Sequence, residues 1–183
     1  MSNEFLKENV LPSNPNPLVR RWREVDGVIY LTVTLDKPTT GDEWTERMEK
    51  KGNRVDVSVK RMFFLKNFTC STAGMYEIVI LKGLLFEYKG CITQNIHAKA
   101  SEMKLVKPNA DIACLIREQL TDEEIEEMGL MFIVTMHEPI EGSNGRPCLL
   151  TTSRYNNGRW LNAHLDLPGI EWEQEYGFAF LAP

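Results

Sequence analysis

The segment from Pro108 to Pro139 carries the strongest agreement among local folding signals, and it reads PNADIACLIREQLTDEEIEEMGLMFIVTMHEP. Its apolar residues from 112 to 120 recur at the i, i+3, i+4 and i+8 spacing of one buried helical face. Asn109 precedes this pattern and is a suitable N-cap residue. The sequence therefore predicts a helix over about 110–120 with one face on the core.

A second, shorter helix is predicted directly after the first. Thr121 and Glu124 have the spacing of a capping box, and the acidic residues at 122–124 favour the positive end of a helix. Gly129 suits the left-handed residue that ends such a helix in a Schellman arrangement. The apolar run over 130–136 is too short for another helix and contains β-branched residues, so it predicts a buried strand.

Strand patterns are present on both sides of this segment. Alternating apolar residues predict a half-buried strand over 28–35, and a nearly continuous apolar run predicts a central strand over 75–81. A short apolar run over 177–181 predicts a terminal strand inside the sheet. Further patterns predict strands over 55–65, with a bulge near 60–62, over 84–88 and, more weakly, over 91–100.

The N-terminal third contains one arginine-rich signal and one helix signal. Arginines on both sides of Trp22 suit contacts with phosphates or bases, but they also suit an edge strand with Trp22 packed inward, which we favour. Thr40 and Glu43 form another capping box. This box predicts a surface helix over about 41–51.

The sharpest local signal is a β-hairpin centred on Asn157-Gly158, a residue pair that type I′ turns prefer. The pairs expected from a two-residue turn at this place are Asn156 with Arg159, Tyr155 with Trp160, Ser153 with Asn162, and Thr151 with His164. One face of the hairpin is then polar and aromatic, which is typical of recognition surfaces and also suits a face covered by the loop over 141–147. The binding residues predicted on this hairpin are Tyr155, Arg159, Trp160, Asn162, His164 and Arg154.

The elements together predict a single α+β domain over 18–183 that follows a flexible arm over 1–17, because three prolines and several asparagines disfavour regular structure in the arm. We expect a mostly antiparallel sheet of about six to eight strands. The surface helix and a helix pair over about 110–128 pack on one face of this sheet. Two lobes with a boundary near Pro108 are the alternative.

Composition favours an intracellular, cytoplasmic protein. No apolar run is long enough to span a bilayer, and the first residues lack the pattern of a secretory leader. The four cysteines are scattered singly without a CxxC pair, so we expect reduced, mostly buried thiols, no metal site and no cofactor.

Charge is unevenly distributed along the chain. Residues 1–107 contain 17 Lys and Arg against 13 Asp and Glu, whereas residues 108–183 contain 4 against 13. The acidic half could attract a charged partner or could simply be a solvated surface. A general nucleic-acid-binding protein is expected to be more basic than this chain.

Recognised catalytic motifs are absent from the sequence. The strongest residual candidates are His137 and Glu138 at a predicted strand end, with His164 or a cysteine as a possible spatial neighbour. These residue types would supply a general base or an activated nucleophile, although a histidine at a strand end is more often only hydrogen-bonded. A small hydrolase or transferase centred on His137 is therefore an alternative hypothesis.

The function predicted from the sequence is that of a non-catalytic protein that binds another protein through the hairpin face and the acidic half. A further alternative is an acidic protein that competes with nucleic acid for a basic partner. The sequence does not indicate the oligomeric state.

Overall fold

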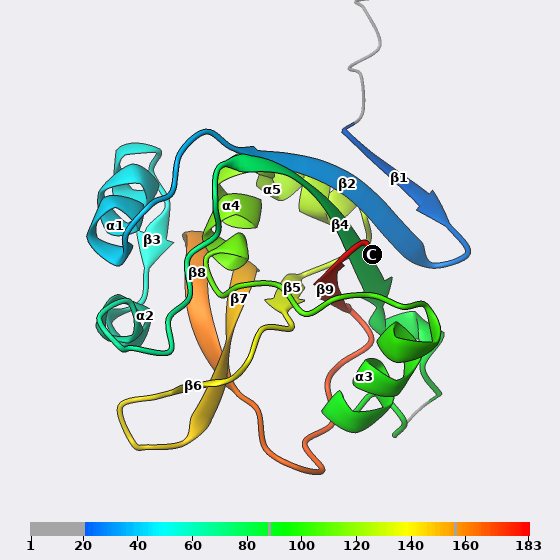
Figure 1. The fold of residues 1–183 in the computed structure, drawn as a ribbon. Helices are drawn as coiled ribbons and strands as arrows, with labels where there is room; N and C mark the ends of the chain where they lie inside the picture. The colour runs from blue at the N-terminus through cyan, green and yellow to red at the C-terminus, as the bar shows by residue number, and fades with distance from the viewer. Residues whose placement is uncertain (1–20, 88, 156) are drawn as a thin grey trace, which may run out of the picture.

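The computed structural model describes residues 21–183 except residues 88 and 156 (Figure 1). Within them the chain forms a nine-stranded sheet in the order β1-β2-β4-β9-β5-β7-β8-β3, with β6 beside β7. The strands are β1 (Trp22–Val25), β2 (Val28–Leu35), β3 (Arg54–Val55), β4 (Gly74–Lys82), β5 (Phe132–Thr135), β6 (Ile140–Glu141), β7 (Pro147–Tyr155), β8 (Gly158–Leu165) and β9 (Tyr176–Leu181). The helices are α1 (Gly41–Lys50), α2 (Val57–Met62), α3 (Thr93–Glu102), α4 (Ile112–Gln119) and α5 (Asp122–Glu127), with a 3-10 turn at Gly83–Leu85.

The α+β class is confirmed, but two details of the predicted architecture are wrong. The sheet is mixed rather than mostly antiparallel, because β3 pairs with β8 and β5 pairs with β9 in parallel. The described residues contain nine strands and five α-helices, which exceeds the predicted six to eight strands and three helices. The parallel pair of β5 and β9 arises because β9 inserts between β4 and β5, and no local pattern reports such a long-range insertion.

Four helices cover one face of the sheet and share a core with it. The buried side chains of α1, α2, α4 and α5 pack against the apolar residues of β2, β4, β5 and β8. Glu118 of α4 lies in this layer with its side chain 3% exposed, and its carboxylate pairs with Arg47 at 2.6 Å and Lys51 at 3.2 Å. The surface helix and the helix pair predicted from sequence both belong to this layer.

The other face of the sheet is covered less completely. Helix α3 and the segment over 166–175 pack on it through Ile96, Ala100 and Trp172, which join the core around Phe178. The Trp172 indole N–H donates to the Thr93 hydroxyl at 3.0 Å and so connects the segment to α3. Neither element covers the outer face of β7 and β8 completely, where two surface hollows lie. This part of the sheet is therefore available for a site.

The central segment folds largely as its local signals predict. Thr121 and Glu124 form the predicted capping box at the start of α5. Gly129 has φ +72°, and the Leu130 N–H donates to the Ile125 carbonyl at 3.0 Å, as in a Schellman stop. The predicted N-cap at Asn109 is wrong, because α4 starts later, at Ile112.

The predicted strand over 55–65 is wrong beyond Val55, because the chain turns into α2 instead. The Asp56 carboxylate accepts a hydrogen bond from the Ser58 N–H at 2.8 Å and caps the new helix. Val59 and Met62 are then buried on one helical face. Alternating valines favour a strand by propensity, but the cap and the burial of an i, i+3 pair outweigh that preference.

Two further predicted strands are also wrong. The predicted strand over 91–100 is replaced from Thr93 onward by α3, in which Ile96 and Ala100 are buried at a spacing of four residues rather than two. The predicted strand over 84–88 is replaced by a 3-10 turn, and residue 88 lies outside the described part. The backbone at Gly83 lies close to that of Glu173, because a Cβ on Gly83 would come within 2.7 Å of the Glu173 carbonyl oxygen. The turn therefore packs directly on the segment over 166–175.

Two substitutions test the stop between α5 and β5. Thr121→Ala removes the cap and should lower the free energy of unfolding by about 1 kcal/mol. Gly129→Ala places a Cβ on a left-handed residue and should cost about 1 kcal/mol or more. Gly74→Ala is the control, because its φ is not positive and its Cβ would meet no atom within 4 Å. Urea denaturation measures all three, and equal losses for Gly129→Ala and Gly74→Ala would contradict the assignment.

Candidate functional site

The register of the C-terminal hairpin decides which side chains share a face. The structure pairs Tyr155 with Gly158, Ser153 with Trp160, Thr151 with Asn162, and Leu149 with His164. Each partner is displaced by two residues from the predicted register, and Arg159 pairs with Arg154 rather than with Asn156, which lies outside the described residues. Because side chains alternate with a period of two, this displacement leaves the composition of each face unchanged.

The polar-aromatic face predicted from sequence is therefore present on the structure. Its members from β7 and β8 are Thr151, Ser153, Tyr155, Trp160, Asn162 and His164. The Asn162 amide donates to the Ser153 hydroxyl at 3.1 Å, and His164 Nδ1 lies 3.0 Å from the Thr151 hydroxyl. Asn162 Oδ1 and His164 Nε2 have no hydrogen-bond partner within the described chain.

Arg154 and Arg159 lie on the opposite face of the hairpin, although the sequence grouped them with the binding residues. Arg159 Nη2 donates to the Leu120 carbonyl at 2.7 Å, and Arg154 Nη1 lies 3.4 Å from a carboxylate oxygen of Glu126. Both arginines thus fasten the hairpin to the corner between α4 and α5. Their contribution to the site is to hold the hairpin in place.

Aromatic rings from other elements extend the polar-aromatic face. The ring of Phe132 in β5 lies 5.4 Å from that of Tyr155, 5.6 Å from that of His164 and 4.5 Å from that of Tyr176. Trp172 lies 5.9 Å from Tyr176 and continues the cluster toward α3. Burial lowers the pKa of His164 and raises that of Tyr176 to about 12, so both side chains are neutral at pH 7.

Two hollows lie along this surface, which we call the hairpin groove. The first has a volume of about 640 Å³ and is lined by Asp56, Tyr155, Asn157, Trp160, Asn162, Ala163 and His164. The second has a volume of about 390 Å³ and is lined by Ala163, His164, Leu165, Ile170, Glu171, Trp172, Glu173 and Tyr176. They share Ala163 and His164. Among the described lining residues the formally charged side chains are Asp56, Glu171 and Glu173, and the Arg54 guanidinium lies 5.4 Å from the centre of the Trp160 ring.

His137 does not join this groove. Its side chain is buried, the Leu150 N–H donates to Nε2 at 2.9 Å, and Nδ1 lies 2.7 Å from the Glu138 carbonyl oxygen. Its proton therefore sits on Nδ1, and both ring nitrogens are occupied by backbone groups. The Glu138 carboxylate is exposed and pairs with Lys107 at 2.7 Å. The structure does not bring His137, Glu138 and His164 together, so no geometric observation favours the predicted hydrolase or transferase.

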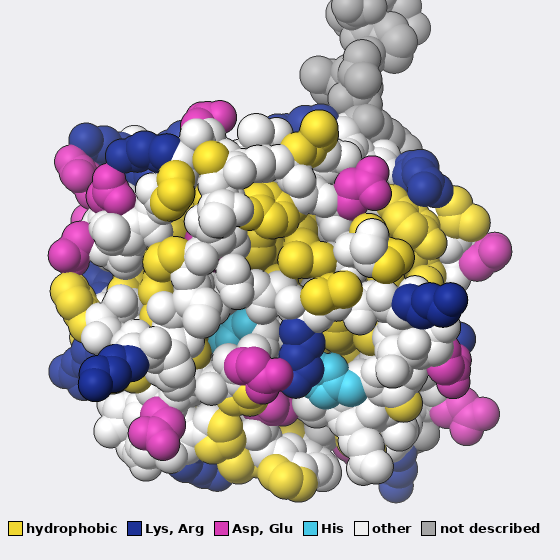
Figure 2. All heavy atoms as spheres, viewed as in Figure 1, with side chains coloured by type: hydrophobic (Ala, Val, Ile, Leu, Met, Phe, Trp, Pro, Cys, Tyr) yellow, Lys and Arg dark blue, Asp and Glu magenta, His cyan; other side chains and the backbone are white. Residues whose placement is uncertain are grey.

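The charge asymmetry of the sequence is compensated in part by pairing between the two halves of the chain. Cations before residue 108 pair with anions after it in Arg21–Glu124, Arg47–Glu118, Lys51–Glu118 and Lys107–Glu138. Figure 2 shows acidic and basic side chains interspersed over one face of the molecule. No single-sign field covers that face, so the observation gives no support to competition with nucleic acid.

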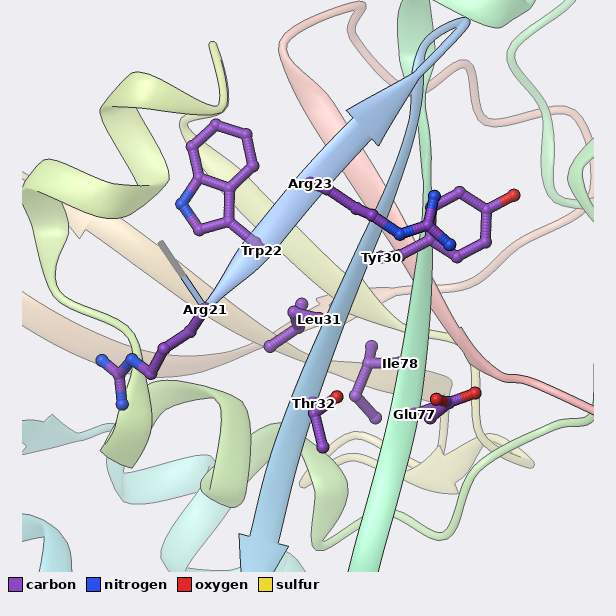
Figure 3. A pocket seen from close by; sticks show the side chains of 8 residues that line it. All are labelled: Arg21, Trp22, Arg23, Tyr30, Leu31, Thr32, Glu77 and Ile78. Carbon is purple, nitrogen blue, oxygen red and sulfur yellow. The ribbon is translucent and has the colours of Figure 1, made fainter. Parts of the chain in front are cut away.

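A smaller hollow of about 240 Å³ lies between β1, β2 and β4 (Figure 3). The Arg23 guanidinium lies 4.1 Å from the centre of the Tyr30 ring, and Figure 3 shows this side chain crossing to that ring. Trp22 is 8% exposed, which confirms that it packs inward from an edge strand. Because stacking already engages Arg23, this hollow is a weaker candidate than the hairpin groove.

The described residues contain free thiols and no cluster of metal-ligating side chains. Cys91, Cys114 and Cys148 are buried and Cys70 is exposed, and all four are free thiols, as predicted. Across residues 21–183 apart from the two gaps, no three His, Cys, Asp or Glu side chains gather as metal ligands. In that same part of the chain, no helix is long and apolar enough to cross a membrane.

The chain matches no family model, no curated protein and no solved structure. The candidate site therefore rests on geometry alone.

Sequence reasoning missed the groove residues outside the hairpin, which include Asp56, Glu171, Trp172, Glu173 and Tyr176, and it missed the neighbouring ring of Phe132. Phe132 belongs to a strand that the sequence predicted to be buried, and its ring lies beneath the aromatic cluster. Trp172 and Tyr176 precede the terminal strand in a segment without periodicity. Trp172 stands between two glutamates in the sequence, and this pattern could have predicted an exposed acidic segment with one buried ring. The Trp172 side chain is buried in the structure.

The burial of His137 makes a prediction about pH. Desolvation lowers its pKa to about 4, and the ordinary value of 6.5 applies to the unfolded chain. As the pH falls, His137 therefore binds a proton in the unfolded state before it does so in the folded state. Its titration lowers the free energy of unfolding by about 2 kcal/mol when the pH falls from 7 to 5. Urea denaturation of the parent and of His137→Gln at both pH values measures this difference. The same pH dependence in both proteins would contradict the buried, neutral histidine.

Proposed function

We propose that this protein is a non-catalytic binding protein that receives a segment of another protein in the hairpin groove. The observation that carries the proposal is the shape and chemistry of the groove, in which aromatic rings surround polar atoms without partners. Rings supply large contact area at low entropic cost, and fixed polar atoms supply orientation. Such an arrangement is typical of recognition rather than of catalysis.

The support beneath the groove favours a preformed site. Thr151 and Ser153 are fully buried and hold His164 and Asn162 by side-chain hydrogen bonds. On the reverse side, Arg159 ties the same hairpin to the end of α4. Binding to a surface held from both sides requires little ordering of the protein, which favours affinity.

We place this function in the cytoplasm. The four free thiols support that location, because extracellular proteins more often use cysteines in disulfides. The proposed partner is accordingly another intracellular protein, and it requires no cofactor.

Site-specific photocrosslinking in the native host tests the proposal. Tyr155 is 40% exposed within the groove, and Met75 is 73% exposed outside the groove linings, on β4. We expect Tyr155→p-benzoylphenylalanine to give a discrete adduct with another protein and Met75→p-benzoylphenylalanine to give none. Adding Trp160→Ala should reduce the adduct about tenfold, because aromatic anchors dominate recognition energies.

The melting temperature of each variant separates binding from folding. Loss of the adduct in a Trp160→Ala protein that melts like its parent supports the groove. Identical adducts from positions 155 and 75, or no adduct from either, would contradict the proposed function.

A further inference from the structure

Strand β8 has an outer edge that is only partly covered. On this edge β3 pairs with Trp160 and Leu161, and the Asp56 N–H adds a hydrogen bond to the Leu161 carbonyl at 3.0 Å. The chain then turns into α2, which packs against β8 without pairing with it, while β8 continues to Leu165. Among the described residues, no strand lies beside the edge over 162–165.

The alternation of backbone groups shows which atoms this edge exposes. The Leu161 carbonyl points toward β3, so the N–H and carbonyl groups of Ala163 and Leu165 point to the same outer side. The backbone N–H and carbonyl groups of Asn162 and His164 point toward β7. The Asp166 N–H follows the same alternation and donates to the Pro147 carbonyl. No described residue provides a hydrogen-bond partner for the outward groups of Ala163 and Leu165.

The hairpin groove runs along this open edge. Its first hollow extends from Asp56, where β3 ends, to His164, and its second hollow extends from Ala163 to Tyr176. The free backbone groups and the free side-chain atoms of Asn162 and His164 therefore border the same space. An extended chain in line with β3 would contact both sets of groups.

We propose that the hairpin groove binds an extended segment of a partner protein as an added strand on β8, with a lysine or arginine directed into the groove. This inference rests on the function proposed above and specifies its occupant. Backbone hydrogen bonds from Ala163 and Leu165 provide the main attachment, as in other cases of strand addition. Asp56, Glu171 and Glu173 favour a cation, and the rings of Tyr155 and Tyr176 add cation–π attraction. The Trp160 ring already has the Arg54 guanidinium 5.4 Å from its centre.

The test begins with a random decapeptide library displayed on phage and selected against the full chain. We expect selected peptides to be enriched in lysine or arginine. A double Glu171→Gln and Glu173→Gln variant should bind them several-fold more weakly. Glu46→Gln, which changes an exposed carboxylate on α1, is the matched control and should leave binding unchanged.

Backbone chemistry then tests strand addition directly. Replacement of Ala163 by lactic acid removes its outward N–H and weakens the Asn162 carbonyl as an acceptor, and it should weaken peptide binding about five- to tenfold. N-methylation of successive peptide residues should abolish binding at every second position and have little effect between them. That period-two pattern is the signature of a strand paired along one edge.

The outcomes separate this inference from the proposed function. The selected peptides could bind in a way that requires Trp160 but does not change with the Ala163 ester or with the position of the N-methyl group. This result would overturn strand addition and leave the groove as a binding site. A failure to select any peptide would overturn both. The free protein could instead self-associate, and the Ala163 ester could disrupt that self-association. This result would show that a second copy of the chain occupies the edge, and it would overturn the proposal of a basic partner segment.

Discussion

The buried guanidinium of Arg117 holds the helix layer against the strands that carry the groove. Its side chain is 0% exposed and donates to the Ser153 carbonyl at 3.2 Å and to the Leu120 carbonyl at 2.8 Å, and it pairs with Asp122 at 2.9 Å. Burial, followed by the nearby charge of Arg159, lowers its pKa to about 10, which still leaves it charged at pH 7. A buried charge costs several kcal/mol unless such partners surround it. Together with Arg154 and Arg159, this group consequently holds β7 in position relative to α4 and α5.

This constraint explains why the two faces of the hairpin differ in role. The face toward the helices contains Arg154 and Arg159, which bind the corner between α4 and α5. Within the described part of the chain no helix covers the other face at Trp160 and Asn162, so this face retains aromatic rings and free polar atoms. The short strand β3 ends beside this face, because Asp56 caps α2 immediately after it. The same cap that starts α2 therefore leaves the edge of β8 open.

The sequence predicted elements wherever a local signal was also the dominant energetic term. The capping box of Thr121 and the left-handed Gly129 determine their segment almost without tertiary help. The composition of the hairpin faces was also predictable, because an error of two residues in register preserves alternation.

Predictions failed where tertiary packing outweighed propensity. Val57 and Val59 entered a helix, and β9 inserted between two distant strands. The aromatic cluster depends on that insertion, so no local pattern could have joined Tyr176 to Phe132.

Residue-resolved hydrogen exchange of the free protein tests the central claim most directly, since that claim is that β8 offers an unpaired edge beside the groove. Four consecutive amides, those of Asn162, Ala163, His164 and Leu165, report on the two sides of one strand. We predict slow exchange for Asn162 and His164, which pair with β7, and fast exchange for Ala163 and Leu165, which face outward. Strong and equal protection of all four amides would contradict the open edge.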